Sequence, residues 1–223
     1  MGHPAFDDAD FLAAALELAA EHGPSAVTVA AISARLKAPT GSFYHRFESR
    51  DALLARLWFS TVQAFQLGIE AALDAGDGLR AALHTPAWVR EHLDEARLLM
   101  LYHRDDFVHG DWPQALREGL AEQQRRGEAR LKKFARDTFG RAGPDEIRRA
   151  QFILSEVPLA AVRQYLMRRE RPPKIVDELI GMTWHAVVDG YRATRRSTAV
   201  AAGRPCRRAV SGQRGQKHKN KAP

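Results

Sequence analysis

Apolar residues recur along the chain at helical spacing, and no segment alternates between apolar and polar residues as a half-buried strand would. In the first fifty residues, three short periodic segments are separated by Gly23-Pro24 and by residues 37–39, where the pattern is interrupted. Acidic residues precede the first segment, and Thr28 is placed to cap the second. The pattern predicts three short helices, the third running from about Pro39 to Arg46.

Longer helices are predicted after residue 48. Ser49 is expected to cap a connecting helix over residues 49–76. Further helices are predicted at about 79–92, 94–105, 112–140, 144–169 and 174–195. Pro86 and Pro158 fall inside two of them, and each predicts a kink or a break because proline removes a backbone hydrogen bond. The predicted fold class is therefore all-α.

The composition is ordinary for a globular protein, with 45% hydrophobic and 27% charged residues. The formal net charge of +7 comes from the C-terminus, because residues 197–223 carry seven Lys or Arg and no Asp or Glu. This segment has no periodic apolar face and is predicted to be a disordered basic tail. Residues 1–196 are formally neutral, so the net charge alone is weak evidence for nucleic-acid binding.

The sequence also indicates in which cellular compartment the protein is expected. No apolar run reaches the roughly eighteen residues that a membrane span needs, and the N-terminus is acidic where a secretory signal would be basic. We therefore expect a cytoplasmic protein without a membrane partner. The single cysteine, Cys206, excludes an internal disulfide and a zinc finger.

Residues 28–54 place two short helices around a tight turn and follow them with a long helix, which is the arrangement of a helix-turn-helix. Apolar side chains are expected to hold the pair on the first helix, namely Ile32, Leu36, Phe43 and Phe47. The opposite side of the third helix would then face outward and enter the major groove of DNA, which is wide enough to admit one helix. The outward residues are Thr40, Gly41, Ser42, Tyr44 and His45.

At these positions the sequence resembles the TetR family of bacterial regulators. The family signature is matched without a gap by Thr28, Val29, Ile32, Gly41, Ser42, Phe43, Tyr44, Phe47, Ser49, Arg50 and Leu53. The resemblance implies a helix-turn-helix DNA-binding domain over residues 1–48 and a helical effector-binding and dimerisation domain over residues 49–196. It also implies a homodimer formed through the last two helices.

The resemblance further implies roles for individual residues. Thr40, Gly41, Ser42 and His45 would approach base edges or the groove wall, whereas Tyr44 and Arg50 would contact phosphates. The predicted DNA-binding set is completed by Thr28, Val29, Lys37 and Pro39.

The chain departs from the family pattern at three positions. Lys37 stands where glycine is usual, Pro39 where serine is usual, and Ala30 where arginine is frequent. The change at Ala30 removes a phosphate contact, while Lys37 and Arg46 are expected to add one each.

Plainer interpretations stay open beside these. Tyr44 could be a core aromatic, His45 and Arg46 a solvated surface, and Arg50 with Asp51 a surface ion pair. The basic tail either adds salt-sensitive, non-specific DNA affinity or has no role.

Aromatic and polar residues are interleaved in the predicted effector domain. A ligand pocket within a helical bundle is mainly apolar with a few polar anchors. The residues predicted to line it for a flat, partly hydrophobic effector are Trp88, Tyr102, His103, Phe107 and Trp112. Each is also a core candidate, because aromatic residues at helical spacing usually are. His103 and His109 are six residues apart and do not share a helical face, so no metal or other cofactor is predicted.

The predicted function is DNA-binding transcriptional regulation, by a repressor that a small-molecule effector releases from a palindromic double-stranded operator. The alternative is a helical ligand-binding or interaction protein with reduced DNA specificity, which Ala30 and Pro39 leave open. An enzyme is not expected, because phosphate-loop, nucleophile-elbow, HExxH and paired-carboxylate motifs are absent from the sequence.

Overall fold

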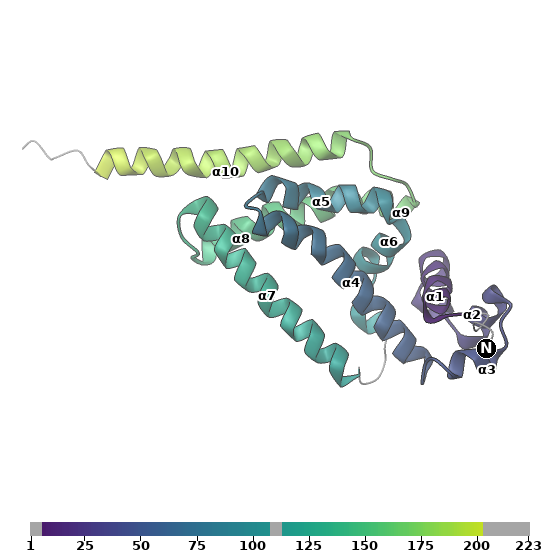
Figure 1. Ribbon diagram of the computed structural model, residues 1–223. Coiled ribbons are helices and arrows are strands. Elements are labelled where there is room, and N and C mark those ends of the chain that lie inside the picture. The colour runs from purple at the N-terminus through teal and green to yellow at the C-terminus, as the bar shows by residue number, and fades with distance from the viewer. Residues whose placement is uncertain (1–5, 108–112, 203–223) are drawn as a thin grey trace, which may run out of the picture.

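The computed structural model describes residues 6–107 and 113–202, with side chains described up to residue 195 (Figure 1). The helices are α1 (Asp8–His22), α2 (Val29–Leu36), α3 (Thr40–Tyr44), α4 (Arg50–Asp74), α5 (Gly78–Glu91), α6 (Leu93–Leu101), α7 (Gln114–Phe139), α8 (Pro144–Gln151), α9 (Val157–Arg168) and α10 (Ile175–Ala202). Two 3-10 turns lie at Pro24–Ala26 and Arg104–Asp106, and a π-helical turn lies at Phe152–Glu156. No described residue is in a strand, which confirms the all-α prediction.

The first three helices form a small unit at one end of the molecule, and α4 runs from this unit into the remaining helices (Figure 1). We refer to residues 6–48 as the head and to residues 49–107 and 113–195 as the body. In the body, α5 packs against α4 and α9, while α10 lies along the outer side against α5 and α9 (Figure 1). The first helix of the body, α4, therefore connects the head to the other helices of the body.

Side-chain caps begin the helices where the sequence predicted them. The Thr28 hydroxyl accepts a hydrogen bond of 3.0 Å from the Ala31 N–H, and the Ser49 hydroxyl accepts one of 3.1 Å from the Ala52 N–H. Gly23 ends α1 with a φ of 86°, a left-handed value that favours glycine. These local signals fix the lengths of the head helices.

The head closes around stacked aromatic rings. Phe11 of α1 and Phe43 of α3 are fully buried, and their ring centroids are 5.9 Å apart in an edge-to-face arrangement. Ile32 and Phe47 are also buried, as predicted. The same apolar cluster continues to Leu98 and Phe107 of the body, so the head packs on the body rather than standing free.

The structure corrects several predicted elements. The helix predicted at 144–169 is divided into α8, the π-helical turn and α9, with Pro158 in the first turn of α9. A proline lacks an N–H and crowds the preceding turn, and a π-helical turn accommodates both effects. By contrast, α5 continues through Pro86 without a break.

The C-terminal boundary is also different. The prediction of disorder from Ser197 is wrong for residues 197–202, which continue α10 as far as Ala202. Three of these six residues are alanine, the best helix former, and the first helix-breaking residues that follow in the sequence are Gly203 and Pro205. The rest of the predicted basic tail lies outside the described residues.

Candidate nucleic-acid interface and effector cavity

The third helix, α3, which we predict to be the recognition helix, presents a polar surface and holds its apolar side in the core. Thr40, Gly41, Tyr44 and His45 are exposed, whereas Ser42 is half-buried. Tyr44 is 59% exposed, and its ring meets Phe43 edge-on with 5.3 Å between centroids. The packing of Phe43 therefore directs the Tyr44 hydroxyl outward. The helix ends at Tyr44, earlier than predicted, and His45 follows as its C-cap.

The turn between α2 and α3 contains Lys37 in the left-handed conformation, with a φ of 54°. This conformation explains why glycine suits the position, since a Cβ is strained there. The Lys37 side chain is exposed and makes no hydrogen bond or ion pair with any described residue. Pro39 follows as the exposed N-cap of α3. Thr28 is exposed at the start of α2, while Val29 is half-buried against the head core.

Arg50 is bound within the domain. Its Nε donates to the Val27 carbonyl at 2.5 Å, one Nη donates to the Pro24 carbonyl at 2.8 Å, and the other lies 2.8 Å from Asp51. The guanidinium thus clamps the start of α4 to the loop before α2. A phosphate contact by Arg50 stays a prediction. To make it, the guanidinium would have to share or give up its hydrogen bonds within the protein.

Arg46 also points inward. Its guanidinium hydrogen-bonds to Asp8 and to the Phe6 carbonyl near the start of α1. This geometry differs from the predicted extra phosphate contact, because the carboxylate of Asp8 attracts the cation toward α1.

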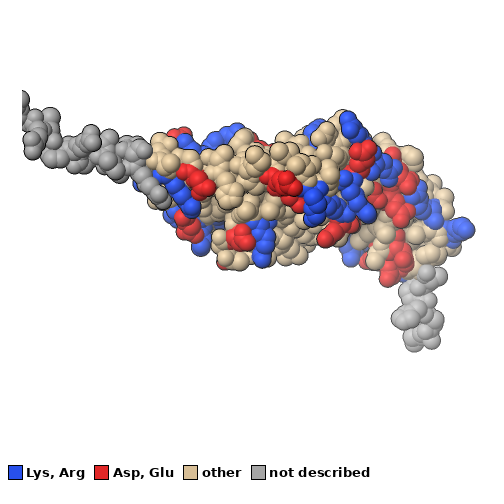
Figure 2. Space-filling view, turned by 90° about the horizontal axis from the view of Figure 1, so that it is seen from above, with Lys and Arg blue, Asp and Glu red and all other residues tan. Residues whose placement is uncertain are grey.

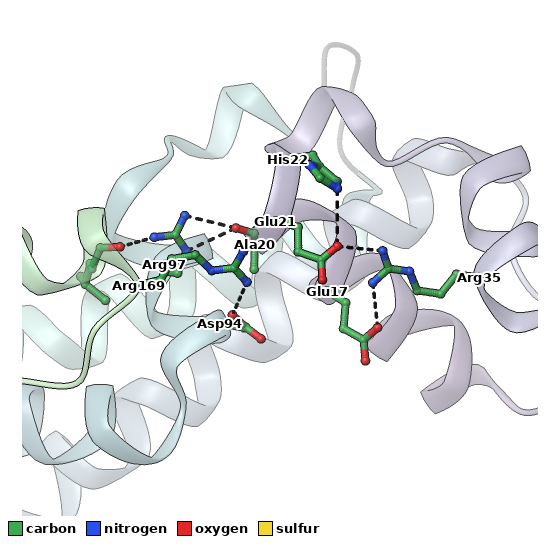
Figure 3. A network of polar contacts seen from close by, with 9 residues as sticks. Glu17, Ala20, Glu21, His22, Arg35, Asp94, Arg97 and Arg169 are labelled. Atoms are coloured by element: carbon green, nitrogen blue, oxygen red, sulfur yellow. Dashed lines mark hydrogen bonds and ion pairs between the residues drawn. The ribbon is translucent and has the colours of Figure 1, made fainter.

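Acidic side chains of the head are separated from the recognition surface. Residues 22–47 contain no Asp or Glu. The carboxylates of Glu17 and Glu21 on α1 lie 3.0 and 2.8 Å from the Arg35 guanidinium of α2 (Figure 3). Hydrogen bonds from Arg35 lower the pKa of Glu21. Glu17 and Glu21 are therefore paired with Arg35, and Lys37 in the turn stays an uncompensated cation among the described residues.

Two adjoining cavities lie in the body, with volumes of about 540 and 550 Å³. Both are lined by Val62, Phe65 and Gln66 of α4 and by Ser155 of the π-helical turn. The first extends along α7, and its further lining includes Ile69, Leu73, Leu120, Gln123, Arg130 and Leu131. The second extends toward α6 and α9, and its further lining includes Leu99, Met100, Tyr102, His103, Leu159, Arg163 and Leu166.

The predicted ligand residues divide between cavity and core. Tyr102 and His103 line the second cavity. Trp88 is buried against Phe65, with 5.0 Å between centroids, and does not itself line either cavity. Phe107 is fully buried in the core. Trp112 lies outside the described residues.

Sequence reasoning missed most of the cavity wall. The wall contributed by α4 includes Gln66, a polar residue beside the apolar side of the helix. This polar residue is the feature of the sequence that could have indicated the cavity. Gln123 of α7 is only 9% exposed, and its amide oxygen has no hydrogen-bond partner among the described residues. A buried, unpaired acceptor on a cavity wall favours a ligand that donates a hydrogen bond.

Comparisons with known proteins agree with this geometry. Residues 11–57 match the family model described as bacterial regulatory proteins, tetR family. The crystal structure of FadR from Bacillus subtilis in complex with stearoyl-CoA matches with a TM-score of 0.59 at 15% identity, over 82% of this chain and 99% of that chain. A candidate tetR family transcription regulator from Shewanella sp. PV-4 matches with a TM-score of 0.55 at 19% identity, over 84% and 98%. No curated protein matches the chain in sequence.

The family match and the fold point to the same conclusion. The matched residues span α1, α2, α3 and the first turns of α4, which are the helix-turn-helix and the helix that follows it. The two structural likenesses extend the shared fold over the body. Within the described residues, no helix combines the length and the apolar character needed to cross a membrane. Residues 11–57 therefore carry the helix-turn-helix of the tetR family of bacterial regulatory proteins, and the chain is a DNA-binding transcriptional regulator.

Proposed function

We propose that the protein is a homodimeric repressor in the cytoplasm, which leaves a near-palindromic operator when an effector occupies the body cavities. The observation that carries this proposal is the double role of α4. Its first turn is clamped to the head by Arg50, and its middle turns line both cavities through Val62, Phe65 and Gln66. A ligand that displaces these residues moves the helix on which the head is mounted.

The exposed surface of α3 supports base reading. Thr40, Gly41 and His45 are exposed, and we assign them to base edges; Tyr44 and Lys37 are also exposed, and we assign them to phosphates. Ser42 is half-buried and contributes less surface to the groove. In this assignment Thr28, Val29 and Pro39 lie at the ends of α2 and α3 that would border the major groove.

Exposed apolar side chains on the last helices support a homodimer. The exposed set on the π-helical turn, α9 and α10 comprises Phe152, Leu159, Met167, Ile175, Leu179 and Met182. Seen from above, the surface along α10 has broad stretches without charged side chains (Figure 2). A two-fold pairing of these helices would cover the apolar residues and set two recognition helices about one DNA turn apart.

The cavity chemistry supports an elongated amphipathic effector. The walls combine Leu, Met, Phe, Val and Ile side chains with polar ones. In the second cavity Arg163 offers a cationic group and His103 a hydrogen-bonding group, and in the first Gln123 offers an unpaired acceptor beside Glu70, Glu128 and Arg130. FadR from Bacillus subtilis, with which this chain shares its fold, is described in complex with stearoyl-CoA. We therefore propose an acyl thioester or a related anionic amphiphile as the effector class.

Operator binding is tested by selecting genomic DNA with the full-length protein and measuring gel shifts at several salt concentrations. We expect one preferred palindrome, with Tyr44→Phe weakening specific and non-specific binding together by about tenfold, since a hydrogen bond to a charged group is lost. His45→Ala should chiefly change site preference. Tyr165→Phe in the body is the matched control. Binding that shows no sequence preference and disappears uniformly with salt would contradict the proposal.

Effector release is tested with stearoyl-CoA, a shorter acyl-CoA and free coenzyme A added to the operator complex. Ser155 lines both cavities, so Ser155→Trp should block the response to acyl-CoA while operator binding persists. Release by free coenzyme A alone, or equal release of the Ser155→Trp variant, would show that the cavities are not the effector site.

A further inference from the structure

Arg97 joins the head to the body through the ends of two helices. It lies on α6 and is only 9% exposed. Its Nε and one Nη donate to the Ala20 carbonyl in the last turn of α1, at 3.3 and 3.2 Å, and the other Nη donates to the Leu166 carbonyl in the last turn of α9. Figure 3 shows the guanidinium between these two elements. One side chain therefore holds together segments 77 and 69 residues away in the sequence.

The electrostatic partner of this buried cation is a pair of helix C-termini. No described carboxylate forms an ion pair with Arg97, and the nearby Asp94 of α6 lies 3.6 Å from Arg169 instead (Figure 3). The C-terminal carbonyls of a helix carry partial negative charge, and α1 and α9 both end at the guanidinium. A guanidinium suits this position because its planar fork of donors reaches two acceptors in different directions.

The same contact connects the cavity to the recognition unit. Leu166, whose side chain is fully buried, belongs to the wall of the second cavity, and its carbonyl accepts the hydrogen bond from Arg97. On the other side, Glu21 follows Ala20 and binds Arg35 of α2 at 2.8 Å (Figure 3). Contacts therefore run from Leu166 through Arg97 to α1, and from α1 to α2.

We propose that Arg97 is the positioning residue that couples the second cavity to the orientation of the head. With the cavity empty, Arg97 holds the ends of α1 and α9 together and fixes the head for the operator. An occupied cavity shifts Leu166 and weakens this clamp, so the head leaves the operator orientation. This inference rests on the proposed function and names the contact through which the effector would act.

The test compares Arg97→Gln with Arg90→Gln in the full-length protein. Arg90 is a matched control, because its guanidinium likewise joins separate segments, at 2.7 Å to the Pro172 carbonyl and 2.6 Å to the Asp177 carboxylate, but both partners lie in the body. For each variant we would measure the operator Kd with and without stearoyl-CoA, and the Kd for stearoyl-CoA alone. The ratio of the two operator Kd values reports coupling, which a purely structural role would leave unchanged.

In the unsubstituted protein we expect stearoyl-CoA to raise the operator Kd by about tenfold or more, within the usual range of allosteric coupling. Arg97→Gln should reduce this ratio to less than about twofold while the Kd for stearoyl-CoA stays within about threefold. Arg90→Gln should keep the ratio. Arg97→Lys should restore thermal stability but not the ratio, since one ammonium group does not span both carbonyls. A normal ratio in Arg97→Gln overturns the proposal.

A second readout separates this inference from the choice of effector. If stearoyl-CoA does not change the operator Kd of the unsubstituted protein, the proposed effector class is wrong, and head orientation is then measured without any ligand. Operators with one base pair inserted between the half-sites should be rejected by the unsubstituted protein and by Arg90→Gln, but tolerated by Arg97→Gln. Equal rejection by all three proteins overturns the role of Arg97.

Discussion

The head and the body are both helical, but the core of the head is closed whereas the core of the body contains cavities. In the head, Phe11, Phe43 and Phe47 form a closed aromatic cluster, and every one of them is at least 96% buried. In the body, aromatic residues such as Phe65 and Tyr102 lie beside cavities, and the π-helical turn between α8 and α9 contributes Ser155 to both cavity walls. A closed core fixes one arrangement of the reading surface, whereas an open one leaves room for a second arrangement on ligand binding.

The largest expected effect comes from removing the centre of the head core. Phe43→Ala should destabilise the protein by about 3–5 kcal/mol and abolish operator binding, because a fully buried ring leaves a cavity between α1 and α3. Phe65→Ala should cost less, since this ring already faces the body cavities. Denaturant unfolding followed by circular dichroism measures both. Equal losses would show that the head is no more tightly packed than the body.

A smaller effect is expected where the body itself is tightly packed. A Cβ added at Gly78, the first residue of α5, would overlap ring atoms of Phe134 and Trp184. Gly78→Ala should therefore destabilise the protein by about 1–3 kcal/mol. Gly127 on α7 is the matched control, because an added Cβ meets nothing there. Gly127→Ala should be neutral or stabilising by up to about 1 kcal/mol, through helix propensity. If Gly78→Ala is as stable as the unsubstituted protein, the side chains of the body can repack even where they are tightly packed.

The sequence predicted the head more completely than the body because head signals are local. Thr28 and Ser49 cap helices within three residues of themselves, and the positions of Phe43 and Phe47 specify one buried face. The inward orientation of the Arg46 and Arg50 side chains was missed, because their partners lie as far as 40 and 26 residues away in the sequence, at Phe6 and Pro24.

In the body, function depends on contacts between distant segments. Tyr102 and Trp88 look alike as aromatic residues on amphipathic segments, but only Tyr102 lines a cavity. The role of Arg97 requires that the ends of α1 and α9 meet, which no periodicity in the sequence indicates. The cavity wall of α4 was missed for the same reason.

An effect of about 1 kcal/mol is expected at the turn of the helix-turn-helix, where stability and DNA affinity should change in opposite directions. Lys37→Gly removes a strained left-handed Cβ, so unfolding should shift to higher denaturant concentration. The same change removes an exposed cation, so operator affinity should fall and the salt dependence should weaken by about one phosphate contact. Lys37→Asn, which tolerates this conformation but has no charge, is the control. Unchanged salt dependence in both variants would remove Lys37 from the interface.

The smallest expected effect is a pH dependence that should belong to the body. His84 of α5 packs beside Phe65, and its Nε2 lies 2.9 Å from the Phe65 carbonyl. Burial lowers the pKa of His84 below its ordinary value of 6.5, although the hydrogen bond with Phe65 opposes this shift. The unfolded chain therefore binds the proton more readily than the folded chain. Stability should be full above pH 6.5 and should decline as the pH falls from there toward the lower pKa of the folded state.

Substitution of His84 by Gln should flatten the part of the stability profile that lies just below pH 6.5. Denaturant midpoints measured at intervals from neutral to mildly acidic pH provide the test, with His45→Gln in the head as the control for losing one histidine. Because Phe65 lines both cavities, the loss of stability on acidification should be accompanied by weaker acyl-CoA binding. If His84→Gln leaves the dependence of stability on pH unchanged while His45→Gln flattens it, the titrating group lies in the head. The pH dependence would then belong to the head and not to the body.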